Sequence, residues 1–294
     1  MTRMETTLVC ELALSAASGL VKRGSALYVV ADDEHFLDTL DAASGRRTHR
    51  VALFGDAVTE HGEDGYSKAT KPDFEALTSL PDGRLLAVGS GSTPARERGV
   101  LVLSGDAGSA PVISGVVDLR PLYARLRAHF GELNIEGATL VGDVVCLLQR
   151  GCHGRSSGLV LLDAARVTRA LARGVLDSDA LVGTHAVDVG ALDGVGLSLT
   201  DACALSGETT RLAFTAAAED TSNAYDDGAC VGSIVGEMNL TGHVERTSRV
   251  AGAHKIEGLA VEGDQAWLVA DPDDRAKRAP LLRGAWPWPH LPAR

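Results

Sequence analysis

One motif recurs five times along this chain, and this repeat constrains the fold more than any other feature. Three clear copies are KPDFEALTSLPDG, LNIEGATLVGD and HKIEGLAVEGD, in which an apolar residue, a glutamate and a small residue precede a short strand and a glycine turn. Two weaker copies are AASGLVKRGS and LTDACALSGE, which place Ser18 and Asp201 at the glutamate position. Self-similarity of this kind is typical of architectures built from repeated supersecondary units.

The spacing of the repeats indicates which repeated architecture the chain adopts. The equivalent residues are Ser18, Glu75, Glu136, Asp201 and Glu257. The steps between them are 57, 61, 65 and 56 residues, so each repeat has room for four strands and their turns. The 33 glycines and only 4% aromatic residues agree with many short strands joined by tight turns. We therefore predict an all-β fold, in which residues 1–294 form a single five-bladed β-propeller with four-stranded blades.

The limits of the blades follow from the repeat. We expect them at residues 15–54, 72–119, 133–190, 197–250 and 254–284. The last blade lacks a fourth strand, and the alternating segment at residues 6–14 resembles the fourth strands of the others, so we predict that this segment closes the ring. Apolar residues at helical intervals predict helices within residues 119–130 and 163–174, and residues 54–72 form a long polar loop.

Charge and composition exclude several classes of function. The chain has 28 basic and 39 acidic residues and a net charge of −11, which disfavours binding to nucleic acids or anionic membranes. No apolar run approaches the roughly 18–20 residues of a membrane-spanning helix, and the first residues do not resemble an export signal. The five cysteines lack C-x-x-C spacing, which fits reduced thiols. We expect a cytoplasmic protein without a nucleic-acid or membrane partner, and leave its oligomeric state open.

The repeated polar residues predict a metal site. The first strand of each propeller blade lines the central channel, so Ser18, Glu75, Glu136, Asp201 and Glu257 would converge on one axis. Neighbouring carboxylates repel each other by several kcal/mol at an effective dielectric of about 20, so the cluster must take up protons or bind a cation. Oxygen ligands alone favour Ca²⁺ ahead of Mg²⁺ or Mn²⁺. The alternative is that these acids end the strands in a solvated channel mouth with no fixed ion.

The loops that follow the first hairpin of each blade are the most polar in the chain, and they are expected on one face of the disc. Binding groups are often carried by such loops on a rigid scaffold. We predict Arg150 and Arg98 as contacts for a small anionic molecule and Glu219 as the carboxylate that orients water. The alternative is that these residues only reflect the usual composition of exposed turns.

The order Ser, Glu, Glu, a fourth oxygen ligand and Glu resembles the calcium-activated nucleotidase (apyrase) family, whose members are five-bladed propellers with one Ca²⁺ in the channel. This resemblance implies Ser18, Glu75, Glu136 and Glu257 as metal ligands. It departs at Asp201, where that family has serine, and Ser198 and Thr200 lie nearby as substitutes. The chain is also similar to an uncharacterised bacterial propeller family in the run FTAAAEDTSNAYDDG, and its E-G-L repeat resembles that of plant-type glutaminyl cyclases.

Three functions are consistent with these features. The first is a Ca²⁺-containing hydrolase of a small phosphate or carboxylic ester, acting at the channel mouth. The second is a non-catalytic propeller in which an axial ion ties the blades together and the disc binds a ligand or a protein. The third is a reaction like that of glutaminyl cyclases, which requires a catalytic carboxylate and no hydrolytic water.

Overall fold

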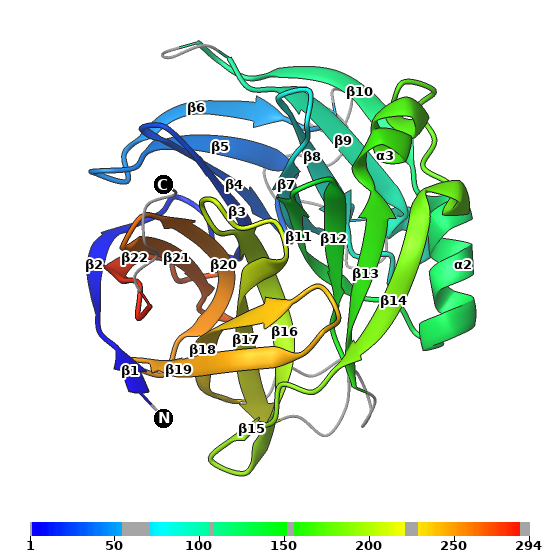
Figure 1. Cartoon of the computed structure of the whole chain (residues 1–294). Coiled ribbons are helices and arrows are strands. Elements are labelled where there is room, and N and C mark those ends of the chain that lie inside the picture. Colours follow the sequence, from blue (N-terminus) through cyan, green and yellow to red (C-terminus); the bar gives the residue numbers. More distant parts are fainter. Residues whose placement is uncertain (1, 55–70, 106–108, 152–155, 221–228, 289–294) are drawn as a thin grey trace.

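The chain forms five sheets arranged around a central axis (Figure 1). The computed structural model describes residues 2–54, 71–105, 109–151, 156–220 and 229–288. Four of the sheets have four strands, and the fifth adds two short strands at its edges to a core of four. The predicted all-β, five-bladed propeller with four-stranded blades is therefore confirmed.

Each blade begins at the axis and proceeds outward. Blade one consists of β3 (Ala17–Arg23), β4 (Ala26–Ala31), β5 (Phe36–Asp41) and β6 (Arg47–Ala52), and blade two of β7 (Phe74–Ser79), β8 (Arg84–Gly89), β9 (Arg98–Leu103) and β10 (Val112–Asp118). Blade three consists of β11 (Ile135–Val141), β12 (Val144–Gln149), β13 (Ser157–Asp163) and β14 (Leu181–Val187). Blade four consists of β16 (Val195–Ala204), β17 (Arg211–Asp220), β18 (Ala229–Asn239) and β19 (Val244–Val250). Blade five consists of β20 (Lys255–Glu262), β21 (Gln265–Asp271), β22 (Pro280–Ala285) and β2 (Thr6–Glu11).

The N-terminal strand closes the ring as predicted. Strand β2 pairs antiparallel with β22 and becomes the outer strand of blade five, which places blue and red segments side by side in Figure 1. The sequence did not predict β1 (Thr2–Met4), which pairs in parallel with β19, so the N-terminal segment touches two blades. A second short addition to blade four is β15 (Ala191–Leu192), which forms a hairpin with β16.

Both predicted helices are present, and they lie at blade three. Helix α2 (Arg120–Phe130) connects β10 to β11, and α3 (Ala164–Leu171) connects β13 to β14. Two short 3₁₀ turns occur at Pro94–Arg96 and Ser178–Ala180. The helices cover apolar surface between blades two and three, where Leu122, Tyr123, Leu126 and Val167 are buried.

The apolar core lies between neighbouring blades. Blades one and two bury Val30, Leu37, Phe74 and Leu85 against each other, and the other four junctions have similar clusters. Burial of roughly 25 cal/mol per Å² of apolar surface at each junction stabilises the ring. The inner strands follow one another around the axis in the order β3, β7, β11, β16 and β20, and β20 lies again beside β3.

Some predictions fall on other parts of the chain. Most of the long polar loop at 54–72 lies outside the described residues, as do residues 221–228 of the acidic run in blade four. Within the described ranges, no helix is long and apolar enough to cross a membrane.

Candidate functional site

Each inner strand carries a bulge at the repeated motif, and the bulges identify the equivalent positions. The pairing of each inner strand with its neighbour skips one residue, which is Glu75 in β7, Glu136 in β11 and Glu257 in β20. A bulge leaves one residue outside the ladder and re-aims its side chain. In β16 the register shifts past Thr200, between Leu199 and Asp201. Thr200, and not Asp201, therefore takes the position of the three glutamates.

Asp201 occupies the position where the other inner strands have a small residue. Its side chain is fully buried, and Oδ2 accepts hydrogen bonds from the backbone N–H of Leu259 at 2.9 Å and of Leu20 at 3.4 Å. Burial raises the pKa of Asp201 well above its usual range, and these backbone donors oppose that shift. The Asp201 carboxyl thus links the inner strands of blades one, four and five.

The small residues after the glutamates have a steric role. A methyl group added to Gly137 would lie 2.7 Å from the Cα atom of Asp201, and one added to Gly19 would lie 2.5 Å from the backbone nitrogen of Leu77. Real side chains do not approach backbone atoms this closely. Glycine therefore allows the inner strands to approach each other at the axis.

The first half of the site is built around Glu75. Its Oε2 accepts a hydrogen bond from the Ser18 hydroxyl at 2.6 Å. Oxygen atoms of Asp32, Asp73 and Glu75 all lie within 4.8 Å of one another, a spacing that suits a metal ion. The ammonium of Lys71 lies 2.6 Å from Asp32 Oδ2 and 2.8 Å from Asp73 Oδ1. Three carboxylates and one lysine thus meet between blades one and two.

The second half is built around Glu219, a predicted catalytic residue at the end of β17. Its carboxylate pairs with Arg150, and its Oε1 lies 3.0 Å from Lys255 Nζ. Arg150 also lies 3.4 Å from Glu136 Oε1, and Lys255 lies 3.4 Å from Glu257 Oε1 and 3.0 Å from Asp273 Oδ1. The structure therefore brings Arg150 and Glu219 together with the two axial glutamates of blades three and five.

The carboxyl groups of the site differ in their pKa values. Burial raises the pKa of Glu75 and of Glu257 well above the usual range, and the nearby Glu136 carboxylate adds to both shifts. Burial also raises the pKa of Glu136, against the opposing charge of Arg150. Burial disfavours ionisation of Glu219 as well, but Arg150 and Lys255 outweigh it, so the pKa of Glu219 is lowered. The site thus combines an ionised carboxylate with carboxyl groups that favour the neutral form.

The site has an excess of acidic groups. Four cations contact seven carboxyl groups, and Glu75 beside them is an eighth, which leaves four formal negative charges to be balanced by protons or by a bound cation. The cations are Lys71, Arg96, Arg150 and Lys255, and the carboxyl groups are Asp32, Asp73, Glu75, Glu136, Glu219, Glu257, Asp271 and Asp273.

Arg98, predicted as an anion contact, is placed elsewhere. It is exposed at the start of β9 and lies opposite Asp118 of β10. Arg96 takes its place at the site, since its guanidinium lies 2.7 Å from Asp73 Oδ2. The 3₁₀ turn at Pro94–Arg96 explains the difference. Arg96 is the last residue of this turn, whereas Arg98 is the first residue of strand β9.

Sequence reasoning missed Lys71 and Lys255, although a signal for one of them was present. Lys255 stands two residues before Glu257, as Asp73 stands before Glu75 and Asn134 before Glu136. Residues two apart on a strand share a face, so this pattern predicts a second ring of polar side chains beside the glutamates. Asn134 fulfils it by donating a hydrogen bond to Glu136 Oε1 at 2.5 Å.

Comparison with known proteins agrees with this architecture. The glutaminyl cyclase of Myxococcus xanthus is 14% identical, with 97% of this chain covering 98% of that one at a TM-score of 0.53, which shows a shared fold. The calcium-binding protein regucalcin of Agrobacterium tumefaciens is 13% identical, with full coverage of both chains and a TM-score of 0.48. A search of the curated proteins found no match. The sequence profile of DUF6929, a family of unknown function, matches residues 13–284, and the chain therefore belongs to that family.

Proposed function

We propose that the channel mouth around Glu75, Glu136 and Glu257 binds Ca²⁺ and hydrolyses a small phosphate or carboxylic ester. The observation that carries this proposal is the group formed by Asp32, Asp73 and Glu75, whose oxygen atoms lie within 4.8 Å of one another. These ligands are all oxygens, which Ca²⁺ prefers, and a divalent ion would offset part of the excess negative charge.

The residues fit such an ion. Asp32, Asp73 and Glu75 would hold it, and Ser18 already touches Glu75. Glu257 Oε2 is buried and has no hydrogen-bond partner among the described residues, which would leave it available to a bound substrate beside the ion. When bound, the ion would supply Lewis-acid polarisation of a phosphoryl or carbonyl oxygen.

The protein's own groups supply the rest of the chemistry. Glu219, kept ionised by Arg150 and Lys255, would orient a water molecule and accept its proton. Arg150 and Arg96 would attract an anionic substrate toward the mouth. The neutral form favoured at Glu257 would provide a proton for the leaving oxygen.

A second candidate is a non-catalytic ligand-binding propeller. It is favoured by Lys71, whose ammonium already lies between Asp32 and Asp73 and closes that group without a metal. A third candidate is cyclisation of an N-terminal glutamine, as in the glutaminyl cyclase that shares the fold. The neutral carboxyl groups favour it, since they could protonate the departing ammonia.

One experiment separates the three candidates. The purified protein is assayed with added Ca²⁺ and after treatment with a chelator, against nucleotides, phosphate esters, lactones and a peptide with N-terminal glutamine. We expect turnover of an ester that is lost on chelation and in Asp73→Asn, but retained in the control Asp264→Asn, whose side chain is exposed in the turn between β20 and β21. Turnover of the glutamine peptide alone would support the third candidate, and no turnover the second.

A further inference from the structure

A groove formed mainly by blade five lies beside the channel mouth. Its inner cavity, of about 480 Å³, is lined by Lys255, Asp271 and Asp273 of the proposed site. Its outer cavity, of about 660 Å³, reaches Leu8 of β2 and Leu282 of β22. The two cavities adjoin each other, because His254, Pro272, Lys277 and Pro280 line both. The groove has the size of a small-molecule site.

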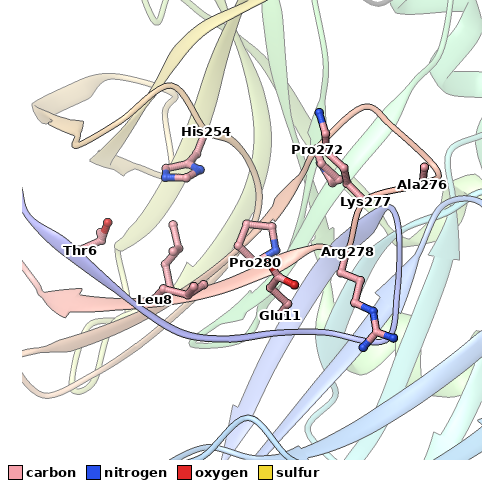
Figure 2. Close-up of a pocket in the computed structure, with 10 residues that line it drawn as sticks. Thr6, Leu8, Glu11, His254, Pro272, Ala276, Lys277, Arg278 and Pro280 are labelled. Carbon is pink, nitrogen blue, oxygen red and sulfur yellow. The ribbon is translucent and has the colours of Figure 1, made fainter.

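The outer cavity is basic on a protein that is acidic overall. Lys277 and Arg278 line it together with His254, and Glu11 is its only carboxylate among the described residues (Figure 2). The ammonium of Lys277 lies 3.3 Å from Asp274 Oδ2, and this carboxylate partly offsets the positive charge of Lys277. No described residue forms an ion pair with Arg278. A local excess of positive charge within a net charge of −11 favours an anionic ligand at this end.

One side of the outer cavity is apolar. Leu8 is 58% exposed, and Pro280 and Leu282 continue the same side of the groove. A single exposed leucine is ordinary on a protein surface, but here it lies beside the basic residues. The cavity can therefore contact an apolar group of a ligand and, next to it, place a cation against a negative charge of the same ligand.

We propose that this groove binds the remote part of the substrate, and that this part carries an apolar group and a negative charge. The reacting end would lie at Lys255, Asp271 and Asp273, and the anionic group at Arg278 and Lys277. This inference rests on the proposed function only in taking the channel mouth as the reacting end. It narrows the substrate class to esters of an amphipathic anion.

The test measures binding without turnover. The probe is 4-phenylbutyrate, which combines an aromatic ring with a carboxylate and has no bond to hydrolyse, and its affinity is measured by isothermal titration calorimetry. We expect millimolar or tighter binding (Kd on the order of 1 mM), at least about fivefold weaker binding of 4-phenylbutanol, and none of 4-phenylbutylamine.

Variants locate the site. Arg278→Ala should weaken 4-phenylbutyrate binding about five- to tenfold, because it removes a cation that no described residue neutralises. Leu8→Ser should weaken 4-phenylbutyrate and 4-phenylbutanol alike. The matched control is Arg283→Ala, an exposed cation on β22 that does not line the groove within the described residues, and it should bind like the wild type.

The failure of this inference is distinct from failure of the proposed function. Equal affinity in Arg278→Ala and Arg283→Ala, or no saturable binding, would overturn the groove assignment even if the protein hydrolyses esters. Binding that depends on Arg278 would uphold it even if no ester is turned over. Circular dichroism of each variant confirms that a loss of binding does not reflect unfolding.

Discussion

Asp201 provides the sharpest test of how the axis is built, because its carboxylate joins the inner strands of three blades through backbone hydrogen bonds. Its Oδ2 accepts hydrogen bonds from the backbone of Leu259 and Leu20, which belong to the inner strands of blades five and one. Asp201→Ala would leave these two N–H groups buried without an acceptor.

The expected loss follows from those contacts. An unsatisfied buried donor costs about 1–3 kcal/mol, and the longer bond to Leu20, at 3.4 Å, lies at the lower end of that range. The total is about 2–4 kcal/mol, which corresponds to a decrease in Tm of roughly 3–7 °C for a chain of this size. The matched control Asp264→Ala removes an exposed carboxylate and should change Tm by less than about 1 °C.

Differential scanning calorimetry with and without Ca²⁺ distinguishes a structural role from a ligand role. We expect Asp201→Ala to lower Tm by the same amount in both conditions and to retain the wild-type increase in Tm on adding Ca²⁺. Asp73→Ala should instead lose that increase. A Tm for Asp201→Ala within about 1 °C of the wild type would refute the hydrogen-bonding role, and loss of the Ca²⁺ response would identify Asp201 as a ligand.

Three further predictions concern pH, packing and ring closure. Burial raises the pKa of Asp271 to about 7, so the folded state binds this proton more tightly than the unfolded chain, and stability falls as pH rises from about 4 to about 7. In urea unfolding in Ca²⁺-free buffer, the free energy of unfolding of Asp271→Asn should fall by roughly 2–4 kcal/mol less than that of the wild type over this pH range. A pH profile equal to that of the wild type would contradict the raised pKa of Asp271. Gly137→Ala should lose at least about 1–3 kcal/mol, since the new methyl group would lie 2.7 Å from the Cα atom of Asp201, whereas Gly196→Ala, with nothing within 4 Å, should be neutral in the same assay. Deletion of residues 2–11 removes β2, so calorimetry should show no cooperative transition, and a wild-type transition would mean that the ring is stable when open.

The sequence was sufficient for the fold because the repeat places an inner strand in every blade. Even the closing strand was predictable, since blade five lacked its own fourth strand and residues 6–14 alternate like the others. Strand β1 was not predictable, because a parallel pair of three residues leaves no pattern in the sequence.

The repeat was sufficient to place Glu75, Glu136 and Glu257 on inner strands, but not to identify the groups around them. The repeat pattern aligns Asp201 with the glutamates, but it does not record where a bulge falls. The hydrogen-bonded register places Thr200 at the bulge. Arg98 and Arg96 are two residues apart, and only the turn that ends at Arg96 decides which of them reaches Asp73. The contacts of Lys71 depend on packing between blades one and two, which no local pattern encodes.

The pairing of β2 with β22 also has a consequence for synthesis on the ribosome. Strand β2 can pair with β22 only after residues 280–285 have been synthesised, so the backbone hydrogen bond from the Leu12 N–H to the Ala279 carbonyl joins two segments made at different times. Contacts between such distant residues slow folding, because the loop must be closed before the contact contributes. Before β2 pairs with it, the outer edge of β22 has free backbone hydrogen-bonding groups. In this state the chain is most prone to aggregate or to bind chaperones.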